Sequence, residues 1–216
     1  MKILAVETAL GACSAALIEN ARVLAHRFEP MERGHAERLA PMVEEVVTEA
    51  KVDLGSLDRL AVTTGPGTFT GQRVGLAFMR GLRIALRRPL IGMTTLATMA
   101  AQARAETGLS RAAALHDARR DEVYIEMEGY IPTGLMAFDD ALKALGRLVR
   151  EEPIALAGTA ASRACDALAN RFVLSTVTQP DARWLARLAE AAPESDGAPR
   201  PLYLRAPDAR LPATTR

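Results

Sequence analysis

One glycine-rich turn limits what this chain can fold into. Thr64–Gly71 reads TGPGTFTG and separates an apolar run, residues 58–63, from a segment of helical periodicity, residues 71–87. A strand, a tight turn and a helix in that order are typical of an α/β protein. The turn could bind a phosphate at the helix N-terminus, but it lacks the Lys-Ser/Thr of a P-loop. We interpret it as a turn that caps the helix, with Thr70 as the N-cap.

The rest of the chain alternates short apolar runs with amphipathic segments. Three runs with tight connections at the N-terminus predict an antiparallel meander. The expected strands are residues 2–7, 13–19, 22–28, 58–63, 89–92, 112–116, 122–128 and 153–158. The expected helices are residues 35–51, 71–87, 94–107, 139–149, 160–170 and 181–191, and residues 202–205 form a short extended piece.

Composition excludes several classes of protein. A chain of 216 residues with 49% apolar and 25% charged residues is long and apolar enough to bury a core, which excludes wholesale disorder. The formal net charge of +1 provides no long-range field for polyanions. Glu7 interrupts the apolar N-terminus, where a secretory signal carries no carboxylate, and no apolar run is long enough for a membrane span. We therefore expect a cytoplasmic protein.

Residues able to catalyse or to bind metal are scattered. The three histidines, His26, His35 and His116, share no i, i+3 or i+4 spacing, so no metal site is predicted. The two cysteines form no C-x-x-C pair, and no G-x-S-x-G elbow is present. Glu7 ends the first expected strand and could face a cleft. The charged turn that begins at Asp117 is interpreted as a solvated turn with local ion pairs.

Two expected helices carry stripes that suit helix packing. In the helix at 35–51 the apolar residues recur with a period of 3.6. In the helix at 71–87 the small residues Ala77, Gly81 and Ala85 are spaced by four, which lets another helix approach closely. Glycine costs about 1 kcal/mol relative to alanine inside a helix, so close packing is a reason for Gly81. The same stripes could instead cover the protein's own sheet.

Five segments in this order resemble the TsaB (YeaZ) family: MKILAVET, HAERLAPM, GPGTFTGQRVG, DARRDEVY and PLYLR. The resemblance implies an α/β fold of the actin-like (ASKHA, ribonuclease H-like) type with two lobes, the second shortened. We accordingly expect an N-terminal lobe over residues 1–108, a shortened C-terminal lobe over residues 109–205 and a flexible tail over residues 206–216.

The resemblance implies a partner subunit in bacterial tRNA modification. Family members bind the paralogue TsaD, together with TsaE, and are required for N6-threonylcarbamoylation of the adenosine next to the anticodon in ANN-decoding tRNAs. TsaD-like enzymes carry an H-x-x-x-H metal motif, and Thr95 and Met99 stand at those positions here. Threonine and methionine cannot replace two imidazoles. Of the enzyme's Gly-Gly nucleotide loop only Gly158 remains. We therefore expect a non-catalytic subunit without metal or cofactor.

The resemblance also implies where the partner binds. The helices at 35–50 and 71–87 would dock on the equivalent pair of TsaD, and a homodimer could form through the same helices. The expected interface residues are His35, Leu39, Met42, Val43, Val46, Gly71, Val74, Ala77, Phe78, Gly81, Leu82 and Ala85. A vestigial cleft would be formed by Glu7, Thr8, Gly65, Gly67, Asp117 and Arg119.

Three alternatives stay open. The first is a peptidase that uses His35 or Glu7, and the second is a nucleotide-binding enzyme of the same superfamily. The third is direct binding of tRNA by a basic strip made of Arg73, Arg80, Arg83, Arg87 and Arg88.

Overall fold

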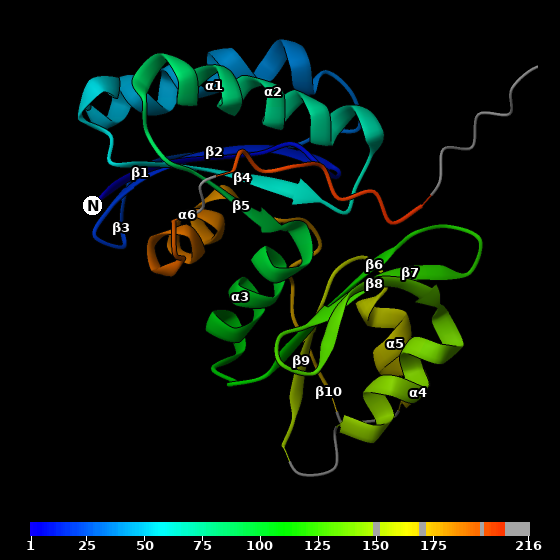
Figure 1. The fold of residues 1–216 in the computed structure, drawn as a ribbon. Coiled ribbons are helices and arrows are strands. Elements are labelled where there is room, and N and C mark those ends of the chain that lie inside the picture. Colours follow the sequence, from blue (N-terminus) through cyan, green and yellow to red (C-terminus); the bar gives the residue numbers. More distant parts are fainter. Residues whose placement is uncertain (149–151, 169–171, 195–196, 206–216) are drawn as a thin grey trace, which may run out of the picture.

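The computed structural model describes residues 1–148, 152–168, 172–194 and 197–205. These residues form two five-stranded sheets with helices on their faces (Figure 1). The strand order is β3-β2-β1-β4-β5 in the first sheet and β10-β9-β6-β7-β8 in the second. None of the described helices combines the length and the hydropathy that a bilayer span requires.

The first sheet begins with the expected antiparallel meander. Its strands are β1 (Lys2–Glu7), β2 (Ala12–Glu19), β3 (Arg22–Pro30), β4 (Arg59–Gly65) and β5 (Leu90–Thr94). Strand β1 pairs antiparallel with β2 and parallel with β4. Helices α1 (His35–Ala50) and α2 (Phe69–Leu86) cover one face, and α6 (Ala182–Ala191) covers the other (Figure 1). A short 3₁₀ helix, η1 (Leu54–Ser56), precedes β4.

Both faces of β1 are buried, and its side chains alternate between two cores. Leu4 and Val6 pack under α1 and α2, whereas Ile3 and Ala5 pack against α6. Successive side chains of a strand point to opposite faces. Residues 3–6 of this strand are therefore apolar at every position rather than at every second one.

The second sheet lies against the first through α3 (Thr95–Thr107). Its strands are β6 (Ala112–Asp117), β7 (Glu122–Met127), β8 (Ile131–Ala137), β9 (Ile154–Ala157) and β10 (Phe172–Leu174). Helices α4 (Phe138–Leu148) and α5 (Ala161–Leu168) cover its outer face. Helix α3 packs on the inner face of this sheet, against β6 and β9.

Several expected elements differ from the observed ones. Strands β8 and β10 were not predicted, and α2 begins two residues before the expected start. The expected helix ends at 149 and 169–170, and the tail at 206–216, lie outside the described residues. The division at 108/109 stays a prediction. Helix α6 falls within the range given to the C-terminal lobe, yet it packs on the first sheet.

Candidate functional site

The glycine-rich turn between β4 and α2 packs against the loop that follows β1. The N–H of Thr68 donates to the carbonyl oxygen of Ala9 at 2.8 Å. A Cβ atom on Gly67 would lie 2.2 Å from that same oxygen, and one on Gly71 would lie 2.2 Å from the carbonyl oxygen of Thr8. Both positions therefore require glycine, because a side chain has no room.

The turn caps α2, as expected, but through a different threonine. Thr68 Oγ1 accepts a hydrogen bond from the N–H of Gly71 at 3.1 Å, so Thr68 is the N-cap. The prediction of Thr70 is wrong, because the helix begins at Phe69 and Thr70 already lies in its first turn. Thr8 ties β1 to the same helix: its Oγ1 donates to the carbonyl oxygen of Gly71 at 2.7 Å.

Glu7 lies in the core rather than in a cleft. Its side chain is fully buried, and so is that of Thr8. Glu7 Oε1 accepts hydrogen bonds from the N–H of Ala9 at 2.6 Å and from Thr63 Oγ1 at 3.1 Å. Burial raises the pKa of Glu7 to about 8, although these two hydrogen bonds favour the charged form. The carboxyl group is therefore mostly protonated at neutral pH.

A cavity of about 750 Å³ opens between the two lobes. The β4–α2 turn lines it with Gly67, and the β6–β7 turn lines it with Asp117 and Arg119. Three of the six expected cleft residues are thus brought together. Gly65 does not line this cavity; it is buried, and a Cβ atom there would lie 2.7 Å from the Gln72 amide.

The β6–β7 turn forms part of the lining of this cleft. The N–H of Arg119 donates to Asp117 Oδ1 at 2.8 Å, and Arg119 has a φ of 64°. His116 also lines the cavity, and burial lowers its pKa to about 4, so the ring is neutral at pH 7. Within the described residues, no group of three His, Cys, Asp or Glu side chains could hold a metal ion.

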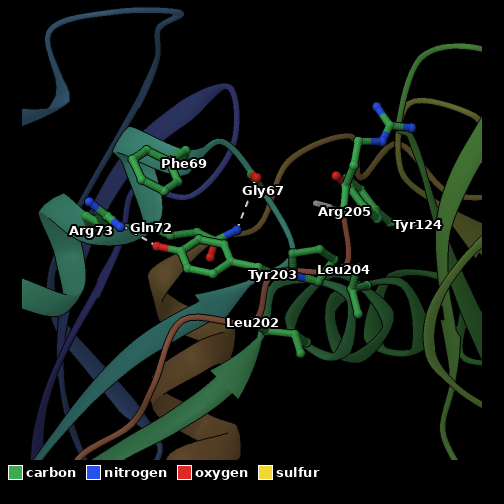
Figure 2. A pocket seen from close by; sticks show the side chains of 10 residues that line it. Gly67, Phe69, Gln72, Arg73, Tyr124, Leu202, Tyr203, Leu204 and Arg205 are labelled. Atoms are coloured by element: carbon green, nitrogen blue, oxygen red, sulfur yellow. Dashed lines mark hydrogen bonds between the residues drawn. The ribbon is translucent and has the colours of Figure 1, made fainter. Parts of the chain in front are cut away.

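A second cavity, of about 410 Å³, lies beside the first and is lined in part by residues 202–205 (Figure 2). The guanidinium of Arg73 lies 3.6 Å from the ring centroid of Phe69, and its Nε donates to Tyr203 Oη at 2.9 Å. The two aromatic rings are stacked with centroids 5.5 Å apart. The N–H of Leu202 donates to the carbonyl oxygen of Thr64. The sequence indicated an extended piece here but not its position on α2.

The expected interface residues divide into three groups by burial. Six are buried in the lobe itself and hold α1 and α2 to their own sheet and turn: His35, Leu39, Met42, Val43, Val46 and Gly71. Three are half-buried against the same core: Val74, Phe78 and Leu82. Three are exposed: Ala77, Gly81 and Ala85. A partner could therefore reach mainly the last group.

Three further residues of α1 and α2 are exposed, although the sequence pattern did not indicate them. Ala36 and Ala40 are exposed on α1, and the side chain of Ile84 is 76% exposed on α2. A Cβ atom added to Gly81 would meet no atom within 4 Å. We call Ala36, Ala40, Ala77, Gly81 and Ala85 the outer helix surface. The two helices lie side by side (Figure 1), and each contributes small exposed residues to this surface.

Comparisons with known proteins agree with this architecture. The family model of TsaD, tRNA N6-adenosine threonylcarbamoyltransferase, matches residues 23–208. The Escherichia coli tRNA threonylcarbamoyladenosine biosynthesis protein TsaB is 44% identical over 124 residues, which is 57% of this chain and 53% of that protein. YeaZ from Pseudomonas aeruginosa is 33% identical, with a TM-score of 0.74 over 94% of this chain and 99% of that one. This chain belongs to the TsaB (YeaZ) family.

The fold is the actin-like ASKHA fold. Component A of the Acidaminococcus fermentans (R)-2-hydroxyglutaryl-CoA dehydratase shares it at 9% identity, with a TM-score of 0.51 over 86% of this chain and 96% of that one. The sequence match to curated TsaB proteins is shorter than the structural match to YeaZ. In its match to the Escherichia coli TsaB, the chain spans about half the length of that relative.

Thr95 and Met99, which we align with the two histidines of TsaD-like enzymes, are both buried in this chain. Thr95 and Met99 are both 0% exposed on α3, and Thr95 Oγ1 donates to the carbonyl oxygen of Pro66 at 2.7 Å. Gly158 has a φ of 100°, and a Cβ atom there would lie 2.0 Å from the carbonyl oxygen of Leu115. Thr95, Met99 and Gly158 therefore make packing contacts inside the protein.

The residues of the peptidase alternative are also occupied by structural contacts. His35 is 9% exposed, and its Nε2 lies 3.1 Å from the carbonyl oxygen of Leu10. Glu7 is held by Ala9 and Thr63 on the opposite side of β1 from α1. Neither side chain lines the two cavities described above.

Proposed function

We propose that this chain is a cytoplasmic, non-catalytic subunit of tRNA threonylcarbamoyladenosine synthesis. In this role it binds TsaD, together with TsaE, and is required for N6-threonylcarbamoylation of the adenosine next to the anticodon in ANN-decoding tRNAs. The names of the curated relatives support the pathway. The similarity to the TsaD family model supports a paralogue as the partner.

The observation that carries the non-catalytic role is the state of Thr95 and Met99. Both stand where TsaD-like enzymes place the histidines of their metal motif, and both are buried in α3. A hydroxyl and a thioether provide neither the charge nor the basicity of two imidazoles. Of the expected cleft residues, Gly67, Asp117 and Arg119 line the cavity, and Asp117 Oδ1 accepts a hydrogen bond from the N–H of Arg119. The replacement of both histidines supports a subunit without transferase activity of its own.

The outer helix surface is the proposed docking site for TsaD. Small exposed residues let the backbones of two helix pairs approach closely, as four-helix packing requires. The buried residues of α1 and α2 act indirectly, because they fix both helices on the first sheet. A homodimer would use the same surface, so TsaD binding and self-association should exclude each other.

Co-purification of the full chain with its own TsaD tests this proposal. We expect a stable complex by size exclusion with light scattering, and we expect Gly81→Glu to weaken it at least tenfold. Gly81 is exposed with open space around it, so the variant should fold normally. The matched control is Ala105→Glu, an exposed alanine of α3, which should leave binding unchanged. Equal binding by wild type and Gly81→Glu would contradict the docking site.

A further inference from the structure

We propose that one side of α2 contacts the phosphate backbone of RNA. We define the arginine ridge as Arg73, Arg80 and Arg83 on α2, together with Arg87 and Arg88, which directly follow its last residue, Leu86. The inference rests on the proposed function, since the relevant RNA would then be the tRNA substrate. It adds that this subunit holds the tRNA directly rather than only through its partner.

The sequence around the ridge contains no acidic residue that could balance its positive charge. Residues 59–105 contain seven arginines and no aspartate, glutamate or lysine. The whole chain, by contrast, has 27 basic and 26 acidic residues and is almost neutral. The positive charge is therefore local, and most of it belongs to α2 and the residues just after it. A local basic stripe on one helix is the electrostatic footprint of a nucleic-acid contact.

The spacing places the arginines along one side of the helix. Arg73, Arg80 and Arg87 are seven residues apart, and Arg83 lies three and four residues from the last two. Residues three, four or seven apart lie on the same side of a helix, and like charges at such spacing disfavour it. The stability of the helix itself therefore does not explain why these arginines lie on one side.

Among the described residues, no carboxylate forms an ion pair with an arginine of the ridge. Other arginines of the described chain do form ion pairs: Arg27 pairs with Glu45, and Arg38 pairs with Glu29. The ridge arginines that are held instead contact neutral groups. Arg80 donates to the carbonyl oxygen of Pro199, and Arg88 donates to that of Gly55 at 2.8 Å. Neutral acceptors orient a guanidinium and leave its charge available to an anion.

The C-terminal end of the ridge is hollowed. A cavity of about 330 Å³ is lined by Arg83, Arg87, Arg88, Ile84 and Pro89. Three arginine side chains thus border one concave site, and a guanidinium can hold a phosphate with two hydrogen bonds. The half-buried side chain of Arg83 and the exposed one of Arg87 both border this site.

RNA fits the ridge better than an acidic protein surface. A protein that docks on the outer helix surface would cover Ala77, Gly81 and Ala85. Each of the residues Arg80 and Arg83 is offset from Gly81 around the helix by 100° or more, at 3.6 residues per turn. These two arginines therefore lie beside the proposed docking surface rather than at its centre, and a partner centred on Gly81 need not cover them. A polyanion that lies along the rim would bind there without displacing the partner.

The test measures binding of unmodified tRNA to the full chain by fluorescence anisotropy, at 50 and 200 mM salt. The variant is Arg83→Glu with Arg87→Glu, and the matched control is Arg22→Glu with Arg147→Glu, two exposed arginines far from the ridge in sequence. The net charge changes equally in both. We expect at least tenfold weaker binding for the ridge variant, with a salt dependence reduced by about two phosphate contacts. The control should stay within about twofold of wild type. Arg87→Glu alone, at an exposed position, serves as a second variant should the pair impair folding.

Three results would overturn the proposal. Equal losses in ridge and control variants would assign the effect to net charge. Unchanged tRNA binding together with lost TsaD binding would make the ridge a surface for an acidic protein. Absence of salt-dependent tRNA binding by the wild-type chain would show that this chain does not contact RNA. Because tRNA affinity is measured on the chain alone and TsaD binding is tested with Gly81→Glu, failure of the two proposals can be distinguished.

Discussion

At the scale of single residues, the sequence predicts the position of the Glu7 carboxyl group at the end of a strand but not the groups that surround it. Glu7 stands at the carboxyl end of a strand, where functional side chains of α/β proteins often face a cleft. In the structure the chain turns back at once, and the N–H of Ala9 binds the carboxyl group from within the core. Such a contact depends on the path of the loop, which periodicity does not describe.

Burial of Glu7 predicts a stability that depends on pH. The pKa of this carboxyl group rises from 4.5 to about 8 on folding, so the folded state binds more protons between these values. The free energy of unfolding contributed by Glu7 therefore falls as pH rises through this window and is constant above it. Glu7→Gln, which keeps the shape without the charge, should be more stable than wild type at pH 8 by on the order of a few kcal/mol.

Urea unfolding of both proteins from pH 5 to pH 8.5 checks this prediction. Burial lowers the pKa of His116 to about 4, so His116 contributes the opposite slope below pH 6.5 in both proteins. The difference between variant and wild type therefore isolates Glu7. A difference that does not change with pH would show that Glu7 ionises in the folded state as it does in the unfolded chain.

At the scale of elements, Gly71 and Gly81, two of the three glycines of α2, have different roles that their spacing does not reveal. Gly71 packs against the β1–β2 loop, where a Cβ atom would lie 2.2 Å from the Thr8 carbonyl oxygen and 2.6 Å from Thr68 Oγ1. Gly81 faces open space. The sequence pattern put both glycines on one stripe and assigned them to the same interface, because a helical wheel cannot tell which neighbour a face meets.

Alanine at these two positions should change stability in opposite directions. Gly71→Ala forces backbone atoms apart and should destabilise the fold by roughly 1–3 kcal/mol or more. Gly81→Ala adds helix propensity at no steric cost and should stabilise the isolated chain by about 1 kcal/mol. Thermal and urea unfolding followed by circular dichroism measure both changes. Destabilisation by Gly81→Ala would mean that α2 packs more tightly there than the structure shows.

At the scale of the whole molecule, the sequence predicted the type of most elements but not which sheet each one covers. Helix α6 was expected from its periodicity and placed with the C-terminal lobe. It instead seals the face of the first sheet that carries Ile3, Ala5 and Ile18. Asp181 caps this helix and lies 3.1 Å from His26 Nε2 on β3. Burial alone would raise the pKa of Asp181, but hydrogen bonds from His26 and Arg183 outweigh it and lower the pKa to about 2. Contacts over such sequence separations leave no local signal in a single sequence.

Because α6 completes the core of the first sheet, the helix and the sheet should unfold together. The single tryptophan, Trp184, lies on α6 and reports the docking of that helix. In urea, the fluorescence of Trp184 should change at the same midpoint as the far-ultraviolet circular dichroism of the whole chain. Leu185→Ala, at a fully buried position of α6, should lower the free energy of unfolding by roughly 2–5 kcal/mol. Both probes should shift by the same amount, whereas a fluorescence transition well below the dichroism transition would show that the first sheet is stable without α6.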